Sequence, residues 1–315
     1  MRDSVLIVGG GRMGCGIAAI AAAAGNRVIV VETSPAGRQA GPKQVSALLK
    51  ELCENQLITS AQKDKALGAV SFAEEISPAC ERAFFVIEAI VENLEQKQRL
   101  FQQLDSLLSP EIPIVSNTSG LRITEIGKFA VHKERLATAH FWFPAHLVPL
   151  VEVVMSDETS QETAVWVRDT LKSWGKAPVI VKKDLPGQLA NRILQAVIRE
   201  ASNIVEMGLA SPEDVDTAVK MGMGIRFPVW GPLEHVDAVG VDLCCSVQNT
   251  VLPGISDKKQ ANSLFHEMVD QGNLGYKTGT GFYDWKVKDM KKLEKLRNDF
   301  IINAVKFIKT REEKD

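Results

Sequence analysis

The sequence feature that most restricts the fold is a glycine-rich turn close to the start of the chain. Residues 9–14 have the pattern G-x-G-x-x-G, and they directly follow the apolar residues 4–8, which are typical of a buried parallel strand. The small residues 14–24 then predict a tightly packed helix. Because residues 28–31 are again apolar, we expect one strand–helix–strand unit within about 30 residues.

Each glycine of this turn has its own expected role in binding the diphosphate of a dinucleotide. Gly9 permits the tight turn, Gly11 lets the backbone approach the pyrophosphate, and Gly14 lets the helix pack closely on the sheet. At the start of the helix, Arg12 and Met13 supply free N–H groups and the positive end of the helix dipole.

Glu32 follows the second predicted strand and suggests which dinucleotide is bound. A carboxylate at this position can accept hydrogen bonds from the ribose hydroxyls, and it would repel a 2′-phosphate. We therefore expect NAD rather than NADP as the cofactor. A glycine turn in an unrelated α/β protein is the alternative, but it does not account for the strand, the spacing and the acid together.

Strands and helices alternate through the first part of the chain and give way to helices alone in the second. Further strands are expected at 83–90, 113–116, 136–140, 151–154 and 179–181, and helices at 94–108, at 161–174 and twice within 40–68. After residues 184–187, helices are expected at 189–207, 212–221, 231–249, 261–271 and from 287 onward. We predict an α/β, Rossmann-type doubly wound sheet in residues 1–185 and an all-α C-terminal domain in residues 186–315.

Composition excludes several classes of function. Lys plus Arg number 37 and Asp plus Glu 39, so the net charge of −2 gives no basis for binding nucleic acid or a membrane. The five cysteines include no C-x-x-C pair, and no group of His, Cys and acidic residues has metal-ligand spacing. The N-terminal apolar run is too short for a signal peptide. We expect free thiols, no metal and a cytoplasmic protein.

Three polar positions are candidates for catalysis and cofactor contact. Asn117 follows a predicted strand whose carboxyl end should face the cofactor crevice. His140 ends the next strand, and Glu152 lies inside the apolar strand after that. A buried carboxylate is costly unless it is paired, and a histidine would be a suitable partner. His140 would then be the acid–base group of an alcohol oxidation, although structural roles for both residues remain open.

The whole set of motifs resembles the 3-hydroxyacyl-CoA dehydrogenase family along nearly the entire chain. The matching segments, in order, are residues 9–14, 86–97, 116–119, 140–144, 150–152, 184–192 and 275–283. The resemblance implies an NAD-dependent enzyme of fatty acid metabolism that oxidises the 3-hydroxyl of a 3-hydroxyacyl-CoA, and a homodimer formed through the C-terminal helices.

The resemblance also assigns roles to individual residues. It implies that His140 and Glu152 form the catalytic pair, and that Ser119 and Asn191 hold the substrate oxygen. It places further residues beside the nicotinamide half of NAD or near the cofactor: Glu92, Lys97, Ser119 and Lys277.

Three positions depart from the family pattern. The family usually has asparagine where this chain has Phe143, a second serine where it has Gly120, and an aromatic residue where it has Gln188. The change at Phe143 removes a polar side chain near His140, which leaves the choice of substrate open.

Two segments favour different substrates. Residues 52–71 resemble the helical hairpin that contacts coenzyme A, where Lys63 and Lys65 could meet phosphates. Residues 144–149 instead resemble relatives that oxidise carnitine, gulonate or a pyridine-ring compound. His146, six residues after His140, could contact the substrate, but as a lone histidine on a loop it is expected to be exposed. A catalytically inactive relative, like a lens crystallin of this fold, is a minor alternative.

Overall fold

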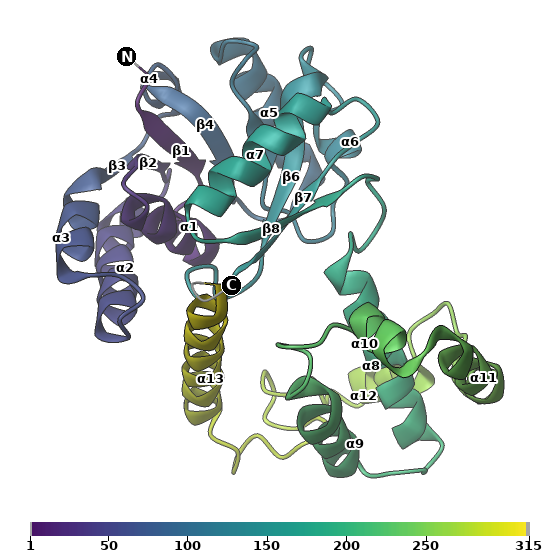
Figure 1. The fold of residues 1–315 in the computed structure, drawn as a ribbon. Coiled ribbons are helices and arrows are strands. Elements are labelled where there is room, and N and C mark those ends of the chain that lie inside the picture. Colours follow the sequence, from purple (N-terminus) through teal and green to yellow (C-terminus); the bar gives the residue numbers. More distant parts are fainter. Residues whose placement is uncertain (1, 313–315) are drawn as a thin grey trace. The chain divides into compact units, whose positions relative to one another are not determined.

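The computed structural model describes residues 2–312, and the chain divides into two compact units, residues 1–190 and 191–315. The first unit is built around a β-sheet and the second consists of helices (Figure 1). This arrangement confirms the predicted fold class.

The first unit contains a single sheet of eight strands, in the order β3-β2-β1-β4-β5-β6-β7-β8. The strands are β1 (Ser4–Val8), β2 (Arg27–Val31), β3 (Val70–Ala73), β4 (Ala83–Glu88), β5 (Ile114–Ser116), β6 (Leu136–Phe141), β7 (Leu150–Val154) and β8 (Ala177–Val181). Neighbours pair in parallel except β6 and β7, which are antiparallel. The sheet thus runs in one direction from β3 to β6 and reverses at β7.

Helices connect these strands. They are α1 (Arg12–Ala23), α2 (Pro35–Glu54), α3 (Ser60–Ala69), α4 (Ile76–Cys80), α5 (Leu94–Leu107), α6 (Ile123–Ile126), the 3₁₀ turn η1 (Lys133–Arg135) and α7 (Gln161–Ser173).

Neighbouring residues of β4 show that α5 and α7 cover opposite faces of the sheet. Phe85 packs edge-on against Trp166 of α7, with 5.2 Å between ring centroids, whereas Val86 belongs to the apolar cluster that contains α5. Successive side chains of a strand point to opposite faces, so each residue meets a different helix.

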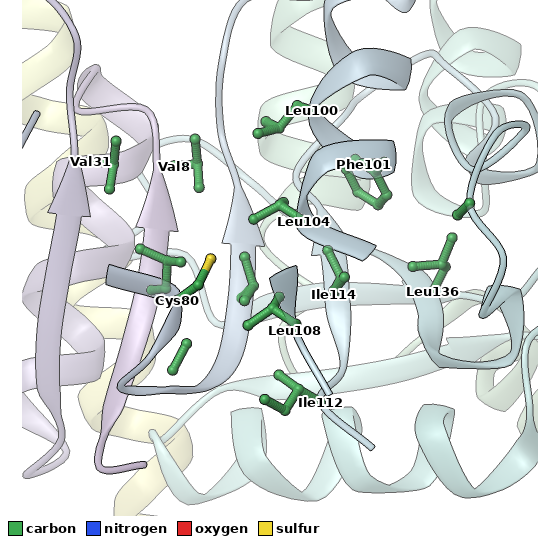
Figure 2. Packing of buried hydrophobic residues seen from close by; sticks show 14 of the residues in the cluster. Val8, Val31, Cys80, Leu100, Phe101, Leu104, Leu108, Ile112, Ile114 and Leu136 are labelled. Carbon is green, nitrogen blue, oxygen red and sulfur yellow. The ribbon is translucent and has the colours of Figure 1, made fainter. Parts of the chain in front are cut away.

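The main core lies between the sheet and α5. Leu100, Phe101 and Leu104 project from one side of α5 toward Val8 and Ile114, as Figure 2 shows. Burial of each of these side chains contributes roughly 1.5–3 kcal/mol. This packing holds β1, β4 and β5 rigidly, so the loops after them start from fixed positions.

The second unit is helical. Its elements are α8 (Ala190–Glu206), α9 (Pro212–Ala218), the π-helix η2 (Val219–Gly224), α10 (Pro232–Val239), α11 (Val241–Val251), the 3₁₀ turn η3 (Leu252–Gly254), α12 (Ser263–Asp270) and α13 (Met290–Glu312).

The short elements β3, α4 and α6 were missed, and one expected helix was wrong. The strand β3 was not expected, because it has only four residues and follows α3 without a turn residue between them. A single helix was expected over residues 231–249, but α10 and α11 are separate. Gly240 between them has φ +104°, a conformation that interrupts a helix and that glycine adopts readily.

None of the helices within residues 2–312 has both the length and the apolar character needed to cross a membrane.

Candidate active site

The glycine turn after β1 is shaped by two very close backbone approaches. A side chain at Gly9, which has φ +113°, would bring a Cβ to 2.5 Å from the carbonyl oxygen of Ala89. One at Gly14 would bring a Cβ to 1.8 Å from the carbonyl oxygen of Gly9. At Gly11, by contrast, a Cβ would meet nothing within 4 Å. Gly9 and Gly14 are therefore required by packing. The backbone at Gly11 faces open space, so a ligand can approach it closely.

The start of α1 has the properties of an anion-binding site. Gly11 is the N-cap and makes no side-chain capping bond, and the first turn, which includes Arg12 and Met13, contains no acidic residue. The first N–H groups of the helix thus have no capping acceptor and carry the positive end of the dipole. These features fit the diphosphate of a dinucleotide.

Arg12 also contacts one of the residues that depart from the family pattern. Its guanidinium carbon lies 5.4 Å from the centroid of the Phe143 ring, in a cation–π contact. Phe143 is 47% exposed. The phenyl ring therefore lies beside the start of α1 and supports the arginine there.

Glu32 is held at the end of β2 by backbone N–H groups. Its Oε2 accepts from Gly10 and its Oε1 from Ser34, each at 2.9 Å. A Cβ at Gly10 would lie 2.9 Å from Cβ of Glu32, and one at Gly37 would lie 2.7 Å from its Cγ. Sequence reasoning missed both glycines; the run of three glycines at 9–11 signalled the first, and nothing signalled Gly37.

A buried charge network follows β4. The Lys97 ammonium is 1% exposed; its Nζ lies 2.6 Å from Oε1 of Glu88 and 3.2 Å from Oε2 of Glu92. Oε2 of Glu88 accepts the Ser116 hydroxyl at 2.5 Å. Sequence reasoning missed Glu88, although an acid at the end of a buried strand was its signal. The network joins the loops that follow β4 and β5.

Glu92 organises the loop after β5. Its Oε1 accepts the Thr118 hydroxyl at 2.6 Å and the N–H groups of Ser119 and Gly120 at 3.2 and 3.1 Å. Partial burial acts to raise the pKa of Glu92, but the Thr118 hydrogen bond and the Lys97 charge outweigh it and lower the pKa. Ser119 is exposed, with its backbone fixed by an ionised carboxylate.

Asn117 connects the ends of β4 and β6 by hydrogen bonds. Its Oδ1 accepts the N–H of Phe141 at 2.9 Å, and its own N–H donates to the Glu88 carbonyl at 2.7 Å. This fixes the end of β6, which carries His140. A cofactor contact by Asn117 stays a prediction.

His140 and Glu152 form a buried pair across the antiparallel strands β6 and β7. They lie opposite each other in the register, and Nδ1 of the histidine is 2.8 Å from Oε2 of the glutamate. Within the described residues, Nε2 of His140 makes no hydrogen bond, so this nitrogen can exchange a proton with a bound molecule.

Both oxygens of the Glu152 carboxylate accept hydrogen bonds. Its Oε2 also accepts Trp142 Nε1 at 3.0 Å, and its Oε1 accepts the N–H groups of Leu189 and Ala190 at 2.9 and 2.8 Å. Burial acts to raise the pKa of Glu152, yet the four hydrogen bonds, with that of His140 the largest, lower it to about 2. The carboxylate is charged at neutral pH, and its contact with Nδ1 fixes the orientation of the imidazole.

Gln188 connects the segment before α8 to the loop after β5. It is buried, has φ +53°, and donates from Nε2 to the Thr118 carbonyl at 3.1 Å. The residues that follow it hold Glu152. Gln188 therefore links the two sides of the site through a side-chain amide hydrogen bond.

The prediction that His146 is exposed was wrong. The residue is 7% exposed, and its Nε2 lies 2.9 Å from Oε2 of Glu51 in α2. Burial, only partly offset by Glu51, lowers the pKa of His146. The error arose because the partner is distant in sequence.

The remaining predicted residues are not part of this cluster. Lys63 pairs with Asp64 at 3.2 Å, and Lys65 lines a cavity of about 530 Å³ at the amino ends of the first strands, where Ser4 and Val70 lie. The glycine turn and His140 are at the opposite, carboxyl edge. Asn191 and Lys277 belong to the second unit, so their roles stay predictions.

The site therefore offers an anion-binding helix start, a carboxylate at the expected ribose position and a histidine with one free nitrogen. Residues 2–312 include no cluster of His, Cys, Asp or Glu side chains able to hold a metal ion. This set of groups is suited to removing a proton from a hydroxyl beside a bound dinucleotide.

Two family sequence models match the chain. The NAD-binding domain of 3-hydroxyacyl-CoA dehydrogenase matches residues 4–185, and the C-terminal domain of the same family matches residues 187–285.

Individual relatives extend this similarity. The 5-formyl-3-hydroxy-2-methylpyridine 4-carboxylate 5-dehydrogenase of Mesorhizobium japonicum is 31% identical over 99% of this chain and 100% of its own. Mouse mitochondrial hydroxyacyl-coenzyme A dehydrogenase is 36% identical over 90% of this chain and 91% of its own.

Solved structures give the same two groups of relatives. A crystal structure of a pyridine-compound 5-dehydrogenase, described as an NAD⁺-dependent dismutase, has a TM-score of 0.90 at 30% identity and covers 98% of this chain and 99% of its own. The (S)-3-hydroxybutyryl-CoA dehydrogenase of Ralstonia eutropha has a TM-score of 0.75 at 34% identity and covers 90% and 99%.

Proposed function

This chain belongs to the 3-hydroxyacyl-CoA dehydrogenase family, a family of NAD-dependent oxidoreductases that act on CH–OH groups, and from that premise we propose that His140 and Glu152 are its acid–base pair. The observation that carries this proposal is the buried contact of 2.8 Å between Nδ1 and the carboxylate, which leaves Nε2 available.

The proposed proton transfer uses both nitrogens of His140. Neutral His140 takes the hydroxyl proton of the substrate at Nε2, while Nδ1–H stays bonded to Glu152. Since the carboxylate is ionised, it stabilises the imidazolium that forms. In the reverse direction, the same imidazolium returns the proton to the carbonyl oxygen. Hydrogen bonds from Trp142, Leu189 and Ala190 keep the carboxylate in place in both directions of the reaction.

NAD would be held by the groups at the carboxyl edge of the sheet. When bound, it supplies the acceptor for the hydride that leaves the substrate carbon. We propose that the N–H groups around Gly11 and Arg12 bind the diphosphate and that Glu32 binds the ribose. Lys97, Glu92 and Ser119 would lie on the nicotinamide side.

For the substrate, we favour a small free acid that carries a hydroxyl group over a coenzyme A ester. The similarity to the pyridine-compound dehydrogenase spans nearly the full chain, including residues beyond 285, where the family model ends. Lys65, one of two lysines expected to meet coenzyme A, lies at the edge of the sheet away from His140. Phe143 replaces the asparagine typical of the family.

A 3-hydroxyacyl-CoA, which the sequence pattern alone placed first, stays the second candidate. Its support is the identity of 36% to the mouse hydroxyacyl-coenzyme A dehydrogenase, together with both family models.

A substrate panel tests the two candidates. NADH formation would be followed with 3-hydroxybutyryl-CoA, carnitine, gulonate and a hydroxymethylpyridine carboxylate. Turnover of a free acid alone supports the first candidate, and turnover of the ester alone replaces it with the second. If no alcohol is oxidised by wild-type protein that binds NAD, the proposed reaction is wrong.

A further inference from the structure

Gln188, close to the acid–base pair, has a backbone conformation that is unfavourable for its residue type. It has φ +53° and directly follows Gly187, which has φ +80°. A left-handed backbone is ordinary for glycine, but a residue with a Cβ adopts it rarely. In the described part of the chain, only Gln188 and Gln56 combine a side chain with a positive φ. Such conformations persist where the surrounding structure holds them, and they are concentrated at functional sites.

The side chain of Gln188 also carries a cost. It is 6% exposed, and its Oε1 is buried and accepts no hydrogen bond from any residue in 2–312. A buried acceptor without a donor costs free energy, which an apolar side chain of similar size would avoid. What the amide provides in return is its hydrogen bond from Nε2 to the carbonyl of Thr118, at 3.1 Å.

That hydrogen bond acts on the peptide group that joins Thr118 to Ser119. The oxygen of this peptide accepts from Gln188, and its N–H, which belongs to Ser119, donates to Glu92 at 3.2 Å. Because a peptide group is planar, holding it at both its oxygen and its nitrogen fixes its orientation. Ser119, the predicted contact to the substrate oxygen, therefore follows a peptide that cannot rotate freely.

The backbone of Gln188 acts on the other side of the site. The next two N–H groups, those of Leu189 and Ala190, both donate to Oε1 of Glu152, at 2.9 and 2.8 Å. Successive N–H groups converge on one anion in this way only in a turn conformation. Since rotation about φ of Gln188 moves both groups together, its left-handed value decides whether they reach Glu152. They supply two of the four hydrogen bonds that lower the pKa of this carboxylate.

We propose that Gln188 is a positioning residue for the oxidation: its amide orients the peptide before Ser119, and its left-handed backbone directs two N–H groups at Glu152. One residue thereby sets the substrate-oxygen side and the acid–base side of the site relative to each other. The inference rests on the proposed function of His140 and Glu152. Every residue that it uses lies in the first unit, residues 1–190.

Two substitutions separate the two contributions of Gln188. Gln188→Gly removes the amide but allows the left-handed backbone without strain. Gln188→Val removes the amide and also disfavours that backbone, because a β-branched residue rarely has a positive φ.

Amide hydrogen exchange, followed by NMR on the full-length protein without NAD, measures both sides of the site without any reaction. We expect the Ser119 N–H to exchange about three- to tenfold faster in both variants, because one hydrogen bond that orders its peptide is lost. The N–H groups of Leu189 and Ala190 should exchange at least about tenfold faster in Gln188→Val and within about twofold of wild type in Gln188→Gly. Gln56→Val is the matched control, because Gln56 is an exposed glutamine with φ +59° and its replacement should leave all three rates unchanged.

Kinetics then show whether this positioning serves the reaction. With the substrate identified by the panel, Gln188→Gly should raise KM about two- to tenfold with little change in kcat, since one orienting hydrogen bond is lost. Gln188→Val should in addition lower kcat at least about tenfold, since the group that orients His140 is displaced.

Two results would overturn the proposal. One is unchanged exchange of Leu189 and Ala190 in Gln188→Val; the other is wild-type kcat and KM in both variants despite faster exchange, which would make Gln188 purely structural. If Gln188→Val does not fold, Gln188→Gly decides, and unchanged KM with unchanged Ser119 exchange contradicts the proposal. Failure of the proposed function is recognised separately, by a normal kcat in His140→Gln.

Discussion

His140 and Glu152 face each other directly across β6 and β7, with Nδ1 and Oε2 separated by 2.8 Å. The contact exists because β7 runs antiparallel to β6. In this orientation, the end of β6 and the early part of β7 meet at the carboxyl edge of the sheet, next to the glycine turn. Directly opposed residues on antiparallel strands have Cβ atoms about 4.5–5.5 Å apart, which lets an imidazole and a carboxylate touch.

Replacement of His140 should abolish most of the activity. His140→Gln keeps a polar side chain but provides no group that can accept the hydroxyl proton at neutral pH, so kcat should fall at least about 10²-fold. Steady-state NADH formation on the substrate identified by the panel measures this. His132→Gln is the control, because the His132 side chain is 38% exposed and its imidazole lies near Glu134, away from His140 and Glu152. A His140→Gln variant with nearly normal kcat would exclude the acid–base role.

Glu152 should make stability depend on acid pH. Its pKa is about 2 in the folded protein against an ordinary value of 4.5, so the folded state binds its proton less readily than the unfolded state. The stabilisation is complete above about pH 4.5 and is lost as the pH falls toward 2. In urea titrations, the difference in free energy of unfolding between wild type and Glu152→Gln should shrink over this interval. If this difference in free energy of unfolding does not depend on pH, the lowered pKa of Glu152 is wrong.

Lys97 should be important for stability. Lys97→Met leaves Glu88 buried without its cation, which should cost about 3–5 kcal/mol in the free energy of unfolding. The double variant with Glu88→Gln should recover part of this loss, because the uncompensated charge is gone. Arg99→Met on the same helix is the control, since its pair with Glu95 is exposed and should change stability by less than about 1 kcal/mol. If Lys97→Met and Arg99→Met lower the free energy of unfolding equally, Lys97 does not stabilise the buried charge of Glu88.

Glu32 should control the choice of cofactor. Glu32→Ala removes the charge that would repel a 2′-phosphate, so the ratio of kcat/KM with NAD to that with NADP should fall. Because the side chain also holds Gly10 and Ser34, Glu32→Gln is the better-matched variant: it keeps the length and an acceptor oxygen. If the ratio is unchanged in both variants, the ribose contact is wrong.

Phe143 should affect NAD binding through Arg12. Phe143→Asn restores the residue usual in the family but removes the ring beneath the guanidinium, a contact worth about 0.5–1 kcal/mol. The Kd for NAD, measured by fluorescence titration, should rise about two- to fivefold. Phe129→Asn is the control, because that exposed ring lies under Lys128 instead. An unchanged Kd would mean that Arg12 does not depend on this support.

Much of the strand–helix–strand unit around the glycine turn was predictable because its signals are local. The glycines of the turn, the first helix and Glu32 lie in one strand–helix–strand unit, and in such a unit the chemistry of each residue largely decides its place. The weakest local predictions were β3 and the helix across Gly240. A strand of four residues is stabilised mainly by its neighbour in the sheet, and a single glycine does not reveal its φ angle in advance.

The sequence by itself determined the division into an α/β part and a helical part, the glycine-rich turn after the first strand, and a histidine and a glutamate whose chemistry suits them to pair. Only the tertiary structure decided that β7 reverses, that Glu88 joins Lys97 and Glu92, and that His146 is buried against Glu51. The physical reason is that these contacts join different elements, and His146 and Glu51 are 95 residues apart. Side-chain chemistry shows that a buried charge needs a partner, but packing of the whole sheet selects which partner it meets.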